Sequence, residues 1–137
     1  MQDNTIIMRS NASREHQAII TQLIFELTYL YKQKFTRLFP YPETMIDASQ
    51  TSPAPDIMLV DPETELTAVI IEITHTQGVN KDLNKMKQLM QDYQVPEGFV
   101  FDYKKKQWHR CAADKAEAEP GNSYCEAIQR NLGELLG

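Results

Sequence analysis

Apolar residues recur at helical spacing in the first quarter of the chain. Ser13 is a suitable helix N-cap, and the spacing behind it predicts a long amphipathic helix that ends near residues 35–39, where Pro40 and Pro42 stop it. The apolar side of this helix consists of Ile19, Ile20, Leu23, Ile24, Leu27, Leu30 and Tyr31.

Shorter apolar runs in the middle of the chain predict strands over residues 43–47, 57–60 and 66–74. Residues 61–65 read as a hairpin turn, so the second and third strands should be antiparallel. The centre of the third run, residues 69–71, is apolar on both faces. A strand of that kind normally lies in the middle of a covered sheet.

The second half of the chain repeats the alternation of helix and strand. Asn80 is a suitable cap for a helix that ends near Tyr93, and strands follow at residues 99–103 and 107–111. We expect a polar loop over residues 112–121 and a last helix capped by Ser123. The order is therefore α-β-β-β-α-β-β-α, in which the second helix permits a parallel crossover. This predicts an α/β fold with a mixed sheet flanked by helices.

Composition restricts the class of protein. A chain of 137 residues fits one domain, which we place at residues 13–137 behind a flexible N-terminus of residues 1–12. The net charge of -5 argues against a uniformly basic nucleic-acid-coating protein, although a local basic face remains compatible with it. Cys111 and Cys125 lack metal-ligand spacing, so we expect free thiols and a cytoplasmic location. No apolar run is long enough for a membrane span.

A carboxylate stands inside the most apolar strand. Burying an unpaired Glu72 would cost several kcal/mol, so a cation or hydrogen bonds must compensate it. The two-residue period of a strand places Ile70, Glu72 and Thr74 on one face. Asp56 begins the neighbouring strand, so the two carboxylates could share one hard cation such as Mg²⁺.

The stretches Pro55-Asp56 and Glu72-Ile73-Thr74 resemble the signature of the PD-(D/E)XK nuclease superfamily, also called restriction endonuclease-like. The resemblance covers residues 15–110 in element order. It implies that Asp56 and Glu72 bind Mg²⁺ or Mn²⁺, which polarises a scissile phosphate and helps to activate a water. In that superfamily the lysine of the signature orients the water or helps to deprotonate it.

Thr74 stands where the signature has this lysine. Some superfamily members carry the lysine on the following helix, and Lys85 is our candidate for it. The resemblance also makes Glu26, from the first helix, a candidate metal ligand, and His75 and Lys81 candidate substrate contacts. The plainer alternatives are a turn cap after Pro55 for Asp56 and an ion pair with a lysine for Glu72. For the other candidates they are a solvated helix face for Lys85, an edge glutamate for Glu26 and a polar loop residue for His75.

Two functions follow from the resemblance. The first is a metal-dependent nuclease that hydrolyses DNA phosphodiester bonds, with DNA as partner and a homodimer implied. The second is a catalytically degenerate PD-(D/E)XK-like protein that acts as a non-enzymatic binding or assembly partner. A regulatory module of unrelated fold is a third reading. His16 and His109 read as surface positions. Residues 104–106 with Trp108 read as a solvated hairpin or as a nucleic-acid contact.

Overall fold

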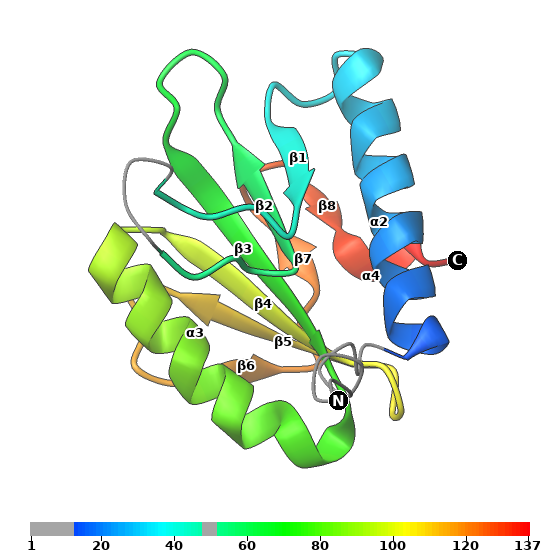
Figure 1. The fold of residues 1–137 in the computed structure, drawn as a ribbon, viewed down its shortest axis with the longest axis vertical. Coiled ribbons are helices and arrows are strands. Elements are labelled where there is room, and N and C mark those ends of the chain that lie inside the picture. The colour runs from blue at the N-terminus through cyan, green and yellow to red at the C-terminus, as the bar shows by residue number, and fades with distance from the viewer. Residues whose placement is uncertain (1–12, 48–51) are drawn as a thin grey trace, which may run out of the picture.

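The protein is described here by a computed structural model that covers residues 13–47 and 52–137. The predicted flexible N-terminus, residues 1–12, lies outside the described residues. One sheet has the strand order β1-β2-β3-β4-β5-β6. Figure 1 shows α2 on one side of this sheet and α3 on the other. The predicted α/β class, with a mixed sheet between helices, is confirmed.

The helices are α2 (Arg14–Lys32), the 3-10 turn η1 (Thr76–Gly78), α3 (Val79–Tyr93) and α4 (Leu132–Leu135). The strands are β1 (Phe39–Pro42), β2 (Ile57–Val60), β3 (Thr67–Thr74), β4 (Glu97–Asp102), β5 (Gln107–Ala112), β6 (Glu119–Pro120), β7 (Tyr124–Cys125) and β8 (Arg130–Asn131). Strands β7 and β8 form a separate hairpin.

The central strand β3 has a different partner orientation on each side. It runs antiparallel to β2 and parallel to β4, with α3 as the crossover. The register pairs Glu72 with Val100 and Thr74 with Asp102. The C-terminal end of β3 therefore meets the start of α3 and the turn that follows β4, and this end of the sheet carries the candidate site.

Two hydrophobic cores hold the helices to the sheet. The stripe Ile20, Leu23, Leu27 and Leu30 of α2 packs on one face, against side chains such as Ile57, Ile71 and Phe99. Met86, Leu89 and Met90 of α3 pack on the other face, against Ile70 and Val100. The prediction that residues 69–71 form a strand buried on both faces is confirmed.

The first strand lies earlier than predicted. Helix α2 ends at Lys32, and the first strand is Phe39–Pro42 rather than residues 43–47. Pro40 and Pro42 lie within β1, which pairs with β2 only. Proline is compatible with an edge strand because one side of such a strand needs no ladder donors. The prediction that these prolines stop the helix near residues 35–39 is wrong, because α2 already ends at Lys32.

The C-terminal prediction is wrong in its details. The predicted helix from Ser123 is replaced by the β7–β8 hairpin and the short α4. The backbone N–H groups of Glu126 and Ala127 donate to the buried Glu97 carboxylate, which holds this segment in a non-helical turn. The predicted loop over residues 112–121 contains β6, which pairs with β5. In the part of the chain that is described, no helix is long and apolar enough to span a bilayer.

Candidate functional site

Two carboxyl side chains meet where β2 begins and β3 ends. The register pairs Ile57 with Ile71, so Asp56, one residue before β2, lies next to Glu72. The carboxyl groups of Asp56 and Glu72 are close enough for each to shift the pKa of the other. The Oδ2 atom of Asp56 also accepts the Ile73 backbone N–H at 2.8 Å. The adjacency expected from the sequence is therefore present.

Glu72 is buried, and one of its carboxyl oxygens lacks a hydrogen-bond partner. Its side chain is only 7% exposed, and its Oε2 atom lacks a hydrogen-bond partner. The closest described cation is the Lys85 ammonium, whose Nζ lies 3.6 Å from Oε2. That contact is an ion pair rather than a hydrogen bond. Lys85 reaches it from α3 with a half-exposed side chain, as the hypothesis of a relocated lysine requires.

The environment separates the pKa values of the two carboxyl groups. Burial, together with the negative charge of Asp56, raises the pKa of Glu72 to about 8, although Lys85 opposes the rise. Burial also acts to raise the pKa of Asp56, but hydrogen bonds from His16 and the Ile73 N–H outweigh it and lower the pKa. At neutral pH the pair therefore keeps one proton, which belongs mainly to Glu72.

His16 completes the cluster from α2. Its Nε2 atom lies 2.9 Å from the Ile73 carbonyl oxygen and 3.4 Å from Asp56 Oδ2. Its side chain is 17% exposed, so the reading of His16 as a surface residue is wrong. The hydrogen bond to Asp56 raises the pKa of His16 although burial opposes it. A signal was present in the sequence, because His16 precedes Ile20 by four residues and continues the buried stripe.

The chain is similar to one protein family in sequence and to a solved structure in fold. A family model described as "Uma2: Putative restriction endonuclease" matches residues 1–129. The chain belongs to the Uma2 family. One solved structure, described as a "putative nuclease belonging to DUF820" from Anabaena variabilis ATCC 29413, shares the fold with a TM-score of 0.66 at 13% identity. The alignment covers 90% of this chain and 80% of that one. No curated protein is significantly similar in sequence.

The Uma2 assignment confirms the resemblance to the restriction endonuclease-like superfamily. The nuclease-like character of the family also agrees with the two carboxylates at the sheet end. Each of these findings concerns the family and the fold. The roles of individual side chains in this Uma2 domain follow only from the geometry of the cluster.

Thr74 is buried in this Uma2 domain. A Cβ atom added to Gly78 would overlap Thr74 Oγ1, so glycine is needed where η1 leads into α3. This close approach brings the start of α3 against the end of β3. Lys85 lies on the second turn of α3 and so gains access to Glu72.

The remaining candidates have separate positions. Glu26 follows His16 by ten residues on α2, about 15 Å along the helix axis, so the structure does not bring it to Asp56. The prediction used its angle around the helix and ignored its height. His75 and Lys81 are both exposed at the end of the sheet where the carboxylates lie. His75 is the residue before η1, and Lys81 lies in the first turn of α3.

The donor set fits a hard divalent cation. Among the described residues, no group of three or more His, Cys, Asp or Glu side chains could hold a metal ion alone. Mg²⁺, however, usually binds through one or two carboxylates and keeps several waters. Asp56 and Glu72 supply two carboxylates, and Glu72 Oε2 is buried without a hydrogen-bond partner. The Ile73 carbonyl oxygen, 2.9 Å from His16 Nε2, is a further oxygen near Asp56.

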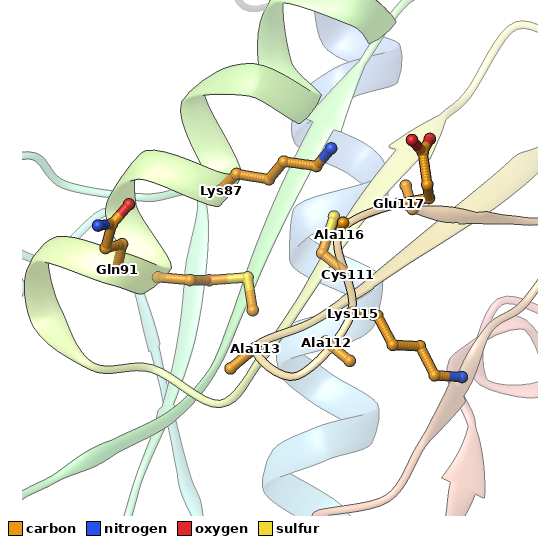
Figure 2. Close-up of a pocket in the computed structure, with 10 residues that line it drawn as sticks. Lys87, Gln91, Cys111, Ala112, Ala113, Lys115, Ala116 and Glu117 are labelled. Atoms are coloured by element: carbon orange, nitrogen blue, oxygen red, sulfur yellow. The ribbon is translucent and has the colours of Figure 1, made fainter.

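A cavity of about 280 Å³ lies elsewhere, between α3 and the segment that follows β5. Figure 2 shows Lys87 and Gln91 on its α3 side, with Cys111 and Glu117 across from them. None of the candidate site residues lines it. Burial raises the pKa of the Cys111 thiol, which makes a poor nucleophile. The carboxylate cluster therefore remains the candidate site.

Proposed function

We propose that the protein hydrolyses phosphodiester bonds of DNA with a divalent cation, Mg²⁺ or Mn²⁺. Asp56, Glu72 and the Ile73 carbonyl would hold the ion. The observation that supports this most strongly is the buried Glu72 carboxyl group, which has an unpartnered oxygen beside a second carboxylate on the adjacent strand. A cation bound there would replace the proton that the pair retains.

A bound cation supplies Lewis-acid polarisation of the phosphate and lowers the pKa of a water. The residues of the chain perform the other tasks. Lys85, with its Nζ beside Glu72, can donate a hydrogen bond to the attacking water and orient it toward phosphorus. His16 donates to the Ile73 carbonyl or to Asp56 and fixes the two oxygens relative to each other. The water oxygen then bonds to phosphorus and releases a proton to solvent, the P–O bond opposite the water breaks, and the leaving oxygen takes a proton from solvent.

The surroundings of the pair support a polymeric substrate. Neither Asp56 nor Glu72 lines any of the three cavities described for residues 13–47 and 52–137, and a long strand would pass the pair at the end of the sheet. His75 and Lys81 are exposed there and would contact substrate phosphates. A homodimer would present two such ends to the two strands of a duplex. The free thiols of Cys111 and Cys125 agree with a reducing, cytoplasmic setting.

A degenerate, non-enzymatic role is the second candidate. Thr74 in place of the signature lysine and the net charge of -5 favour it. In that case the domain would bind or assemble with a partner and hydrolyse nothing. The two candidates differ in whether Lys85 takes over the task of the missing lysine.

Cleavage of supercoiled plasmid separates them. With Mn²⁺ or Mg²⁺, the wild-type protein should produce nicked circles, and Asp56→Ala should abolish the product. Lys85→Ala should slow nicking by about 100-fold, the loss of a group that acts on the attacking water. Lys87→Ala is the matched control, because Lys87 is exposed on the same helix and lies beside the separate cavity. Equal nicking by Asp56→Ala would exclude this site, and intact plasmid with the wild type would favour the degenerate role.

A further inference from the structure

Three consecutive lysines form the turn between β4 and β5. Lys104, Lys105 and Lys106 are all exposed, in a chain whose net charge is -5. We call these three residues the lysine turn. Like charges this close repel one another, so the arrangement is unfavourable for folding in itself. If the lysine turn has a fixed position next to the candidate site, its positive charge can contribute to the binding of an anionic ligand.

A buried carboxylate fixes the shape of the turn. Asp102 is 1% exposed, and its Oδ1 atom accepts the backbone N–H groups of Lys104 at 3.0 Å and Lys105 at 3.2 Å. The same oxygen accepts the Thr76 hydroxyl at 3.0 Å. Lys106 adopts a left-handed conformation with φ 55°, which closes the turn. The lysine turn is thus locked to the segment that follows β3 rather than free to move.

Two further contacts join the turn to residues that neighbour the candidate site in sequence. On one side, the Tyr103 backbone N–H donates to the Thr74 carbonyl at 2.9 Å, two residues from Glu72. On the other, Lys104 Nζ lies 3.4 Å from Glu15 Oε1, next to His16. Figure 1 shows this turn, in yellow, beside the N-terminal end of α2. The lysine turn therefore lies beside the end of β3 and the start of α2, the two elements that carry Glu72 and His16.

The existing partner of the turn is replaceable. The ion pair of Lys104 with Glu15 joins two side chains that are 58% and 54% exposed. Such exposed pairs contribute little to stability, so a phosphate can take the place of Glu15. Lysine ammonium groups bind phosphates as point charges and need no fixed donor plane. The turn therefore suits a repeated anionic backbone better than a single shaped ligand.

We propose that the lysine turn is the contact for the DNA phosphate backbone that guides a strand across the Asp56–Glu72 pair. This deepens the proposed function and rests on it for the identity of the substrate. Neutralising the turn should weaken DNA binding without any effect on the ion site. The same number of charges removed elsewhere should have little effect.

Fluorescence anisotropy with a labelled 20-base-pair duplex in EDTA tests this, since binding is then measured without cleavage. The Lys104→Gln/Lys105→Gln/Lys106→Gln variant should bind about 10-fold more weakly in 50 mM salt. Its slope of log K against log[salt] should shrink by about 2 to 3, close to 0.9 per lost phosphate contact. The control is Lys32→Gln/Lys34→Gln/Lys87→Gln. It removes the same charge, with Lys32 near the other end of α2, and should change affinity less than about 2-fold.

The outcomes separate this proposal from the nuclease proposal. Equal losses in the two triple variants would show an effect of net charge alone and would overturn the role of the turn. The absence of wild-type binding to the duplex would overturn it as well. The shift in melting temperature with Mn²⁺ reports on the ion site independently and should be equal in wild type and both variants. If the wild type does not nick plasmid but the lysine-turn variant alone loses DNA binding, the role of the lysine turn is supported and the nuclease proposal is rejected.

Discussion

Two buried glutamates on neighbouring strands have opposite environments. Glu97 of β4 is 4% exposed and Glu72 of β3 is 6% exposed. The Glu97 carboxylate accepts Arg110 Nε at 2.9 Å and the backbone N–H groups of Glu126 at 2.7 Å and Ala127 at 3.1 Å. The Oε2 atom of Glu72 has no hydrogen-bond partner.

The difference teaches how to separate a structural carboxylate from a functional one. Burial alone does not, since the two residues are equally hidden. At Glu97 the neighbours are complete, and even the Cys125 thiol, whose pKa burial raises to about 12, donates at 3.6 Å. At Glu72, among the residues that the structure describes, the compensation consists of a shared proton and the Lys85 ammonium at 3.6 Å. We infer that Glu97 stabilises the fold and that Glu72 binds a ligand.

The largest expected effect is on stability at Glu97. Glu97→Ala should lower the free energy of unfolding by about 3 to 5 kcal/mol, because it removes the buried partner of Arg110 Nε, which keeps only its contacts with Glu119 and Glu126, and leaves two backbone N–H groups unpaired. Urea denaturation measures this. A loss below about 1 kcal/mol would mean that the carboxylate is not the anchor of the C-terminal hairpin.

Glu72→Gln should have the reverse profile. We expect plasmid nicking to fall about 100-fold or more, which corresponds to about 2.7 kcal/mol of transition-state stabilisation. The free energy of unfolding without metal should stay constant or rise, since a neutral amide replaces a group that resists ionisation. Rates from gel densitometry and a urea titration on the same sample give both values. Strong destabilisation of the Glu72→Gln variant would show that Glu72, like Glu97, has a structural role.

The pH dependence of stability follows from the raised pKa of Glu72. Between its ordinary pKa of 4.5 and about 8, the folded state holds a proton that the unfolded state has released. The contribution of Glu72 to stability is therefore complete below about pH 4.5 and is lost as the pH rises through 8. Metal-free wild type should lose on the order of 2 kcal/mol relative to Glu72→Gln between pH 5 and 8. Parallel curves for the two proteins would contradict the raised pKa.

The smallest expected effect concerns the close contact between Gly78 and Thr74, where α3 approaches β3. Gly78→Ala should cost about 1 kcal/mol, because the new methyl group would overlap Thr74 Oγ1. Thr74→Ala in the same chain should recover most of that loss by removing the oxygen. A double-mutant cycle in urea measures the coupling. Additive losses would show that Gly78 does not set the approach of α3 to β3.

The sequence allowed a correct prediction of the central geometry and missed the contributions of distant elements. Asp56 and Glu72 could be paired because a hairpin turn and the two-residue period fix neighbouring strands. Lys85 was a residue-level hypothesis, supported by its 3.6 Å approach to Glu72. His16 was missed because its partners lie 40 and 57 residues away.

Other errors have equally physical causes. Glu26 was judged by its angle on α2, whereas its height along the helix decides its reach. The last segment has apolar residues at helical spacing, but Glu97 captures two of its N–H groups and prevents the first helical turn. That competition depends on a tertiary contact, so the local spacing of apolar residues does not predict it.

The most direct test of the account is calorimetric titration of Mn²⁺ into the metal-free protein at pH 8. We predict one ion per chain, with affinity lowered by about 10-fold or more in Glu72→Gln, whose amide cannot replace the anionic ligand. Undiminished binding by Glu72→Gln, or no binding by the wild type, would contradict the claim that the unpartnered Glu72 oxygen marks a cation site.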